Sequence, residues 1–246
     1  MNRENLYLST TASDAAAQAK DKGLGLEIAE FCTAWNMDEA LEKTRQALMP
    51  QLAGISRRVL HGPFNELFPC AIDPSARRLA AYRYRQAIAL AKEFGAKKVV
   101  LHGGFQPRMY YPVWYVEQSI LFWKDFLKED PGVEIVLENV LEEEPGMLRS
   151  IVAGVEDPRL RLCLDVGHVH VYSPVPVARW VEEWAPWLSH FHIHNNDGSW
   201  DTHSPLMEGT IPIWELLSQV EELCPRATIT LELLEAETSL RWLLEE

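Results

Sequence analysis

The sequence predicts a single (β/α)₈ barrel that takes up residues 1–246 as one domain. Three observations lead to this fold class: short apolar runs recur along the chain, helix-length stretches separate them, and 246 residues suffice for one small barrel. No linker or low-complexity segment divides the chain. We therefore expect one folded unit.

Eight apolar runs of strand length follow one another at intervals of roughly 30 residues. Each is too short for a helix and rich in β-branched or aliphatic residues, which is typical of buried parallel strands. In chain order they are LYLST (6–10), GLEIAEF (25–31), RRVLHG (57–62), KKVVLHG (97–103), VEIVLEN (133–139), LRLCLDV (160–166), LSHFHIHN (188–195) and TITLELL (228–234). An open doubly wound sheet is the alternative, but it usually has fewer strands and a glycine-rich phosphate turn. Neither GxGxxG nor GxxxxGKS/T occurs in the first third of the chain, so the repeats indicate a TIM barrel.

The stretches between these runs show the periodicity of amphipathic helices. The clearest is residues 76–98, and Gly95 is the expected stop signal. Its apolar positions are Leu79, Tyr82, Ile88, Leu90, Ala91 and Phe94. Each predicted strand is thus followed by a helix, as the barrel requires.

Composition places the chain among ordinary globular proteins, with 47% hydrophobic and 24% charged residues. The first ten residues contain no apolar run suited to a signal peptide, and no apolar stretch is long enough to span a membrane. We expect a cytoplasmic protein whose state of oligomerisation the sequence leaves open. Cys32, Cys70, Cys163 and Cys224 form no CxxC pair and are expected to be reduced thiols.

Polar residues of the kind that bind metals follow six of the eight predicted strands. They are His61, His102, Glu138, Asp165, His194 and Glu232. The carboxyl ends of parallel strands share one rim of a barrel, and an unpaired carboxylate there is costly because its removal from water costs several kcal/mol. Arg108 is the one cationic side chain expected nearby and cannot neutralise three strands. A divalent cation can, and this ligand set suits zinc, manganese or iron.

A second group of such residues lies close by in the sequence. His168 follows the sixth predicted strand, and the D-x-H spacing of Asp201 and His203 allows both side chains to point the same way from an extended loop. The alternative is that Asp201 and His203 merely stiffen the long loop after the seventh strand. Long loops are usually functional, so we favour ligation. His190 and His192 are interpreted as hydrogen-bonded interior residues, and His170 is left open.

At these residues the sequence resembles the xylose-isomerase-like TIM-barrel superfamily, which includes sugar isomerases, tagatose-type epimerases and the apurinic endonuclease family. The resemblance spans the first to the last predicted strand. It is carried by LHGPF, VVLHGG, VLEN, LDVGH, LEL and, above all, HIHNNDG-x-x-D-x-H with EGTIPIW.

The resemblance implies a role for each residue. In endonuclease-type members three zinc ions are held, and the positions that match are His61, His102 and Glu138 for the first ion, Glu138, Asp165, His194 and Glu232 for the second, and His168, Asp201 and His203 for the third. In epimerase-type members one ion occupies the second set, and two glutamates matching Glu138 and Glu232 exchange a proton with the substrate. We expect one to three ions of zinc or manganese.

Our first hypothesis is isomerisation or epimerisation of a small sugar or related polyol, with Glu138 and Glu232 as the acid/base pair. Trp35, Phe105 and Trp200 are expected to pack against the sugar, with Arg108 beside them, although packing between loops is an equal alternative for each aromatic residue. The full set of nine ligand-type residues favours a second hypothesis, the multi-metal hydrolysis of a phosphodiester, and single-ion epimerases do not need the pair His61 and His102.

Charge argues against the nucleic-acid version of that second hypothesis. The net charge is −13, and the predicted mouth loops contain one arginine, Arg108, beside the acids 142–144. Duplex-binding proteins neutralise several phosphates with lysine or arginine, so we expect a neutral small molecule and no nucleic-acid partner. A third hypothesis, metal binding without catalysis, fits poorly because a closed structural site needs only four ligands.

Overall fold

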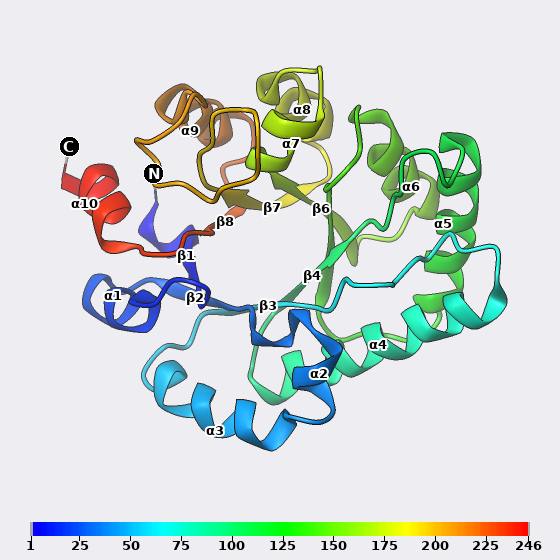
Figure 1. The fold of residues 1–246 in the computed structure, drawn as a ribbon, viewed down its shortest axis with the longest axis horizontal. Coiled ribbons are helices and arrows are strands. Elements are labelled where there is room, and N and C mark those ends of the chain that lie inside the picture. The colour runs from blue at the N-terminus through cyan, green and yellow to red at the C-terminus, as the bar shows by residue number, and fades with distance from the viewer. Residues whose placement is uncertain (1, 246) are drawn as a thin grey trace.

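Eight parallel strands close into a barrel in the computed structural model, which describes residues 2–245 (Figure 1). The strands are β1 (Leu6–Ser9), β2 (Gly25–Ile28), β3 (Arg58–His61), β4 (Lys98–His102), β5 (Glu134–Glu138), β6 (Leu160–Asp165), β7 (Leu188–Ile193) and β8 (Thr228–Leu231). Each strand pairs with its neighbour in sequence, and β8 pairs with β1 to complete the ring. The predicted TIM barrel is confirmed.

Helices surround the barrel as an outer layer (Figure 1). They are α1 (Ala15–Lys22), α2 (Ala34–Met37), α3 (Leu41–Leu52), α4 (Pro74–Glu93), α5 (Pro112–Phe126), α6 (Gly146–Val155), α7 (Val166–Tyr172), α8 (Val177–Trp184), α9 (Ile213–Leu223) and α10 (Glu237–Glu245), with 3₁₀ turns η1 (Arg3–Asn5) and η2 (Glu30–Cys32). None of the helices in the described part of the chain is long and apolar enough to cross a membrane.

The helix predicted over 76–98 differs from α4 at both ends. It begins at Pro74, because the Asp73 side chain accepts a hydrogen bond from the Ser75 N–H at 2.6 Å and proline favours the first helical turn. It ends at Glu93, just before Gly95 turns to a φ of +71°. Lys98 belongs to β4, within the strand predicted over 97–103, so the helical stretch stops before the expected Gly95 and not at residue 98.

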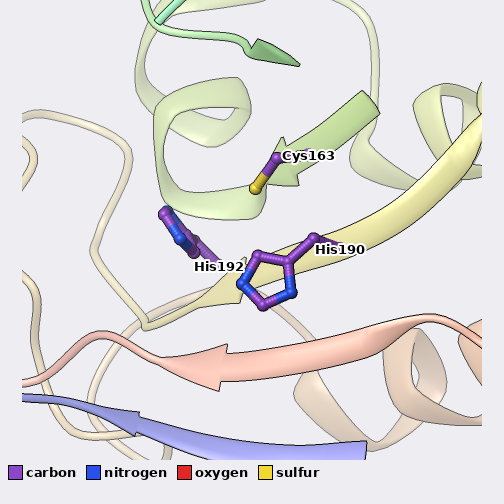
Figure 2. Close-up of side chains that lie close together, drawn as sticks. All are labelled: Cys163, His190 and His192. Carbon is purple, nitrogen blue, oxygen red and sulfur yellow. The ribbon is translucent and has the colours of Figure 1, made fainter. Parts of the chain in front are cut away.

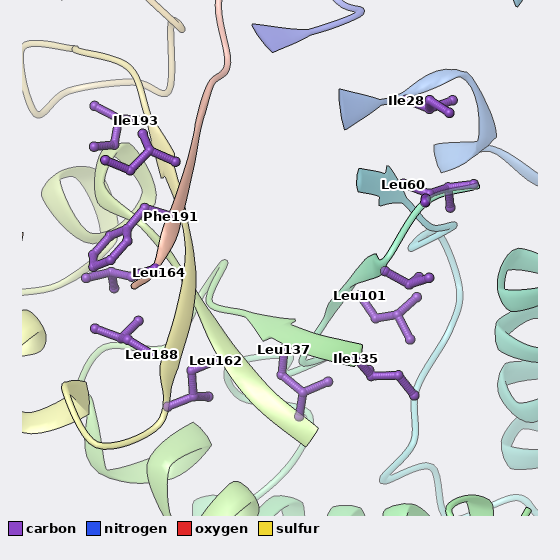
Figure 3. Close-up of a cluster of buried hydrophobic side chains, with 14 of the residues drawn as sticks. Ile28, Leu60, Leu101, Ile135, Leu137, Leu162, Leu164, Leu188, Phe191 and Ile193 are labelled. Carbon is purple, nitrogen blue, oxygen red and sulfur yellow. The ribbon is translucent and has the colours of Figure 1, made fainter. Parts of the chain in front are cut away.

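The outward-facing side chains of the strands form the hydrophobic core against the helices. Figure 3 shows part of this core, in which Leu101, Leu137, Leu162 and Phe191 come from successive or neighbouring strands. Side chains alternate along a strand, so the residues between them face the barrel axis. There, a smaller apolar layer of Tyr7, Val59, Val100, Val136 and Cys163 fills part of the interior.

Strand β7 contains one extra residue that sets the direction of its side chains. Leu188 pairs with Leu162 and His190 pairs with the next residue, Cys163, which leaves Ser189 as a bulge. Beyond the bulge, His190 and His192 face the barrel axis, where Figure 2 shows them beside Cys163. All four cysteines are free thiols, as expected.

Candidate metal centre

The strand ends bring the predicted ligands to one rim of the barrel. His61, His102, Glu138 and Asp165 are the last residues of β3, β4, β5 and β6. Glu232 follows β8 directly. Because all strands are parallel, these side chains meet at the carboxyl-terminal mouth, the face that carries the site in TIM-barrel enzymes.

The first group consists of His61, His102 and Glu138. Oε2 of Glu138 lies 3.2 Å from Nε2 of His61 and 3.4 Å from Nε2 of His102. His61 Nδ1 donates to the Gly62 carbonyl at 2.9 Å, which leaves its Nε2 facing the carboxylate. The ring of Phe64 stacks on His102 at 4.3 Å between centroids and fixes that imidazole. The structure thus brings together the three residues that were predicted for a first ion, and their ligation of a metal stays a prediction.

The second group centres on His192. Its Nδ1 lies 3.3 Å from Glu138 Oε1, 3.4 Å from Glu232 Oε2 and 3.8 Å from Asp165 Oδ2. The sequence pattern predicts His194 for this place and a hydrogen-bonded interior position for His192. The interior position holds for one nitrogen of His192: Nε2 hydrogen-bonds to Glu27 at 2.9 Å. The other nitrogen, Nδ1, faces the three carboxylates of the mouth.

The third group contains Asp201 between two imidazoles. Asp201 Oδ2 lies 3.3 Å from His168 Nε2 and 3.2 Å from His203 Nε2. The Nδ1 atoms of both histidines donate to backbone carbonyls, those of Asn139 and Glu232, at 2.9 Å each. These bonds turn both Nε2 atoms toward Asp201, as ligation would require.

His194 lies between the second and third groups. It is fully buried, and its Nε2 is 3.3 Å from Asp165 Oδ1 and 3.5 Å from Asp201 Oδ1. Its ring stacks on His203 at 4.0 Å between centroids, with 9° between the planes. His194 was predicted to lie beside Glu138 and Glu232, but His192 occupies that position and His194 lies beside Asp165 and Asp201.

The chemistry of these atoms tests whether a cation fits. Of nine buried side-chain N or O atoms without a hydrogen-bond partner in residues 2–245, six lie here. They are Glu138 Oε2, Asp165 Oδ2, His192 Nδ1, both ring nitrogens of His194 and Asp201 Oδ1. Buried polar atoms are almost always paired, so this concentration of unpaired oxygen and nitrogen atoms fits divalent cations as shared partners.

Electrostatics within the mouth point the same way. Burial alone would raise the pKa of Glu138, but the imidazoles of His192 and His102 hold it well below its usual range. Burial lowers the pKa of His102 to about 3. Burial would do the same to His61, but the neighbouring Glu138 carboxylate raises that pKa to about 9. The ionised carboxylates thus favour a positive charge beside them, either on an imidazole or on a metal ion.

The predicted substrate-contacting residues are spread around this rim. Trp35 and Trp200 are exposed by 65% and 69%. Phe105 is buried and packs against Tyr115 at 5.0 Å between ring centroids, so it stabilises a loop in this conformation. Arg108 is exposed and lines, with Phe105, a cavity of about 570 Å³ between the loops after β4, β5 and β6. Contact of these residues with a substrate stays a prediction.

Glu27 on β2 is a charged residue of the barrel interior that was not among the predicted site residues. It is fully buried and hydrogen-bonds to His190 and His192. The available signal was a carboxylate in the middle of the apolar run 25–31, which no core position accepts without partners.

A closed eight-stranded barrel with imidazoles and carboxylates gathered at its carboxyl-terminal rim defines a class, the TIM-barrel proteins with a metal-type site at the mouth. Within this class, the chain belongs to the xylose isomerase-like TIM barrel family, whose model matches residues 14–246.

Two curated relatives and one solved structure illustrate the similarity. The uncharacterized protein MJ1311 of Methanocaldococcus jannaschii is 28% identical over 185 residues, 71% of this chain and 63% of that protein. Fructoselysine 3-epimerase of Shigella flexneri is 26% identical over 193 residues, 74% of this chain and 66% of that enzyme. The matched region therefore spans slightly less than two thirds of either relative. The TTHB071 protein from Thermus thermophilus, in a structure described as soaked with ZnCl2, superposes with a TM-score of 0.78 at 26% identity, covering 98% of this chain and 97% of that one.

Proposed function

We propose that this chain is a divalent-metal-dependent isomerase or epimerase that acts on a small neutral sugar or related polyol. The observation that carries the proposal is the placement of two glutamates about one point: Glu138 and Glu232 lie 3.3 and 3.4 Å from the same nitrogen, Nδ1 of His192. A relative that is named a fructoselysine 3-epimerase supports the substrate class.

The residues that would hold metal fall into the three groups described above. For the central ion we assign Glu138, Asp165, His192 and Glu232, with His192 in the place first given to His194. His61 and His102 would hold a further ion with Glu138, and His168, Asp201 and His203 a third. Zinc or manganese suits this mixture of imidazole and carboxylate, and the zinc-soaked structure of a similar protein favours zinc.

The proton chemistry falls to the two glutamates. A bound cation would polarise the carbonyl and the adjacent hydroxyl of the substrate. One glutamate accepts the proton from the carbon next to the carbonyl, and the other, in its acid form, donates a proton to the opposite face of that carbon. Protons balance, and the configuration of the carbon is inverted.

The charge of the mouth supports a neutral substrate. Arg108 is the one arginine of the predicted mouth loops, and it is exposed and lines the same cavity as Glu143 and Glu144. A substrate with several phosphates would need more positive charge than this to offset the acidic residues of the rim.

Hydrolysis of a phosphodiester is the second candidate. The observation that favours it is the third group, since a single-ion epimerase has no use for His168, Asp201 and His203 as ligands. Adjacent ions can stabilise the attacking and leaving oxygens of a displacement at phosphorus.

Proton exchange in D₂O tests the first proposal directly. The zinc- or manganese-loaded protein should incorporate deuterium at the carbon next to the carbonyl of a ketose from a panel, detected by NMR. Glu138→Gln and Glu232→Gln should each reduce the exchange rate by about 10²-fold or more, since each removes one acid/base group.

A matched control is Glu117→Gln, which makes the same substitution at an exposed position of α5 and should leave exchange unchanged. Cleavage of a phosphodiester without exchange into any ketose would replace the first proposal with the second.

A further inference from the structure

The interior of the barrel below the mouth contains a buried ionisable residue where aliphatic side chains are usual. Glu27 on β2 is fully buried, and both of its carboxylate oxygens are hydrogen-bonded. Oε1 bonds to His192 Nε2 at 2.9 Å, while Oε2 bonds to His190 Nε2 at 2.9 Å and to Thr230 Oγ1 at 2.6 Å. TIM-barrel interiors are filled mostly by valine, isoleucine and leucine, and an unpaired carboxylate there would be strongly destabilising. The polar layer around Glu27 therefore differs from the usual apolar filling of a barrel interior.

The bond between Glu27 and His192 determines where the imidazole carries its proton. A glutamate is ionised at neutral pH and then only accepts hydrogen bonds. His192 must therefore donate through Nε2–H. A neutral imidazole has a single N–H, so the lone pair of His192 lies on Nδ1. Nδ1 is the nitrogen that faces Glu138 and Glu232 and has no hydrogen-bond partner among the described residues.

Glu27 is itself held in place from below by a chain of hydrogen bonds with one consistent direction. Lys98 Nζ donates to Thr228 Oγ1 at 2.8 Å, and the Thr228 hydroxyl lies 2.6 Å from His190 Nδ1. If that hydroxyl donates to Nδ1, His190 donates through Nε2 to Glu27, and every donor in the chain meets an acceptor. The lysine ammonium has no acceptor capacity, so it fixes this direction at its start.

We propose that Glu27 is a positioning residue, which fixes the tautomer and the orientation of His192 so that Nδ1 presents its lone pair to a divalent metal ion at the barrel mouth. This inference rests on the proposed function, since it assigns His192 to the central ion. It extends that function because it makes part of the metal affinity a property of the barrel interior, on β2, β7 and β8. Carboxylates that orient a ligating histidine commonly change metal affinity by about 10- to 100-fold when they are removed.

Affinity for Zn²⁺ provides the first test. Glu27→Leu replaces the carboxylate with an apolar side chain of similar size that suits a barrel interior, and leaves His192 free to take either tautomer. Competition with a chromophoric chelator should show about 10- to 100-fold weaker Zn²⁺ binding than in the wild-type protein. The matched control is Thr230→Val, which removes a hydrogen bond to Oε2 of Glu27 but keeps the bond from Oε1 to His192. It should change affinity less than about threefold. Equal losses in the two variants would mean a general role in stability and would overturn the proposal.

A second measurement does not depend on the folding of any variant. In the Zn²⁺-loaded wild-type protein labelled with ¹⁵N-histidine, NMR should show His192 protonated at Nε2 and unprotonated at Nδ1. Protonation at Nδ1 in the loaded protein would overturn the proposal. The outcomes also distinguish the role of Glu27 from the proposed reaction. If Zn²⁺ binding depends on Glu27 but no sugar is turned over, the proposed reaction is refuted and the role of Glu27 stands. If the wild-type protein binds no Zn²⁺, both proposals are refuted.

Discussion

Protons and metal ions compete for the same imidazole nitrogens at the barrel mouth. Burial alone would lower the pKa values of His61 and His203, but Glu138 beside the first and Asp201 beside the second raise both to about 9. In the metal-free protein both rings are therefore protonated at neutral pH. Metal ligation needs a neutral imidazole, so each proton must leave when a metal ion binds.

We expect the affinity for Zn²⁺ to rise with pH up to about 9 and to level off above it. The sign follows from the raised pKa values, because below pH 9 His61 and His203 are protonated and a metal ion must displace their protons. For each proton released, the affinity rises about tenfold per pH unit in this range. Competition titrations between pH 6 and 10, with calorimetry in buffers of different ionisation enthalpy to count released protons, would measure this. Affinity that is independent of pH would contradict it.

Single residues differ in how well the sequence reveals them. His61, His102, Glu138, Asp165 and Glu232 could be found because each ends or directly follows an apolar run whose last position must lie at the rim. The role of Glu27 could not, because its partner His192 is 165 positions away in the chain and the contact depends on how the two strands align across the barrel. A sequence pattern predicts which face of a strand a side chain occupies, but not how that strand is aligned along the barrel axis relative to a distant strand.

At the scale of elements, α7 fits closely against the end of β7 at a glycine. A Cβ atom on Gly167, the second residue of α7, would overlap the ring of His194. Close approach of this kind explains why a glycine occupies a helical position, where alanine is otherwise favoured.

Gly167→Ala should lower the free energy of unfolding by about 1 to 3 kcal/mol, because the added methyl group overpacks a filled site. Gly146→Ala in α6 makes the same change where no atom lies within 4 Å, so its effect should lie between zero and a gain of about 1 kcal/mol. Urea denaturation of the two variants measures the contrast. Equal effects would show that helix propensity, and not contact with His194, governs position 167.

The side chain of Asn195 makes several of the hydrogen bonds that hold the loop between β7 and α9. Asn195 Nδ2 donates to the carbonyls of Leu206 and Ile211 at 2.8 and 3.2 Å, and Oδ1 accepts from the Ile211 N–H at 3.0 Å. These bonds close the loop that carries Asp201 and His203. The position of the third group therefore depends on Asn195.

Asn195→Ala should destabilise the protein by about 1 to 3 kcal/mol and increase protease cleavage within residues 196–210, since buried backbone groups lose their partners. Asp197→Ala is the control: its exposed side chain bonds only locally, to Ser199, and its loss should cost less than about 0.5 kcal/mol. Limited proteolysis with thermal denaturation would measure both. Similar cleavage of the two variants would count against the role of Asn195.

For the molecule as a whole, the fold is the feature that the sequence reveals best. Eight repeats of strand and helix leave few topologies, because parallel strands need crossovers and crossovers are right-handed. Boundaries were less certain, as α4 shows, since capping by Asp73 competes with the apolar period in setting where a helix starts. Side-chain contacts across the barrel interior, such as that between Glu27 and His192, could not be predicted because they depend on how distant strands align.

Removal of metal should lower the stability of the whole barrel. The mouth joins groups from six strands, and an ion that binds only the folded state stabilises it by about 2.7 kcal/mol at a concentration 100 times its Kd. For a chain of this size we expect chelation by EDTA to lower the melting temperature by about 5 to 10 °C. EDTA already saturated with zinc is the control and should have no effect. An unchanged melting temperature would argue against tightly bound metal.

The bulge at Ser189 shows that the pairing register of β7 matters as much as its residues. Side chains of a regular strand alternate strictly, so the same chain without the bulge, with Ser189 opposite Cys163, would exchange the occupants of the two sides from this point onward. Phe191 and Ile193 would then enter the axis, and His190 and His192 would turn to the apolar side beneath the helices. The same amino acids in the same order would then give a barrel whose central metal-binding group lacks its imidazole.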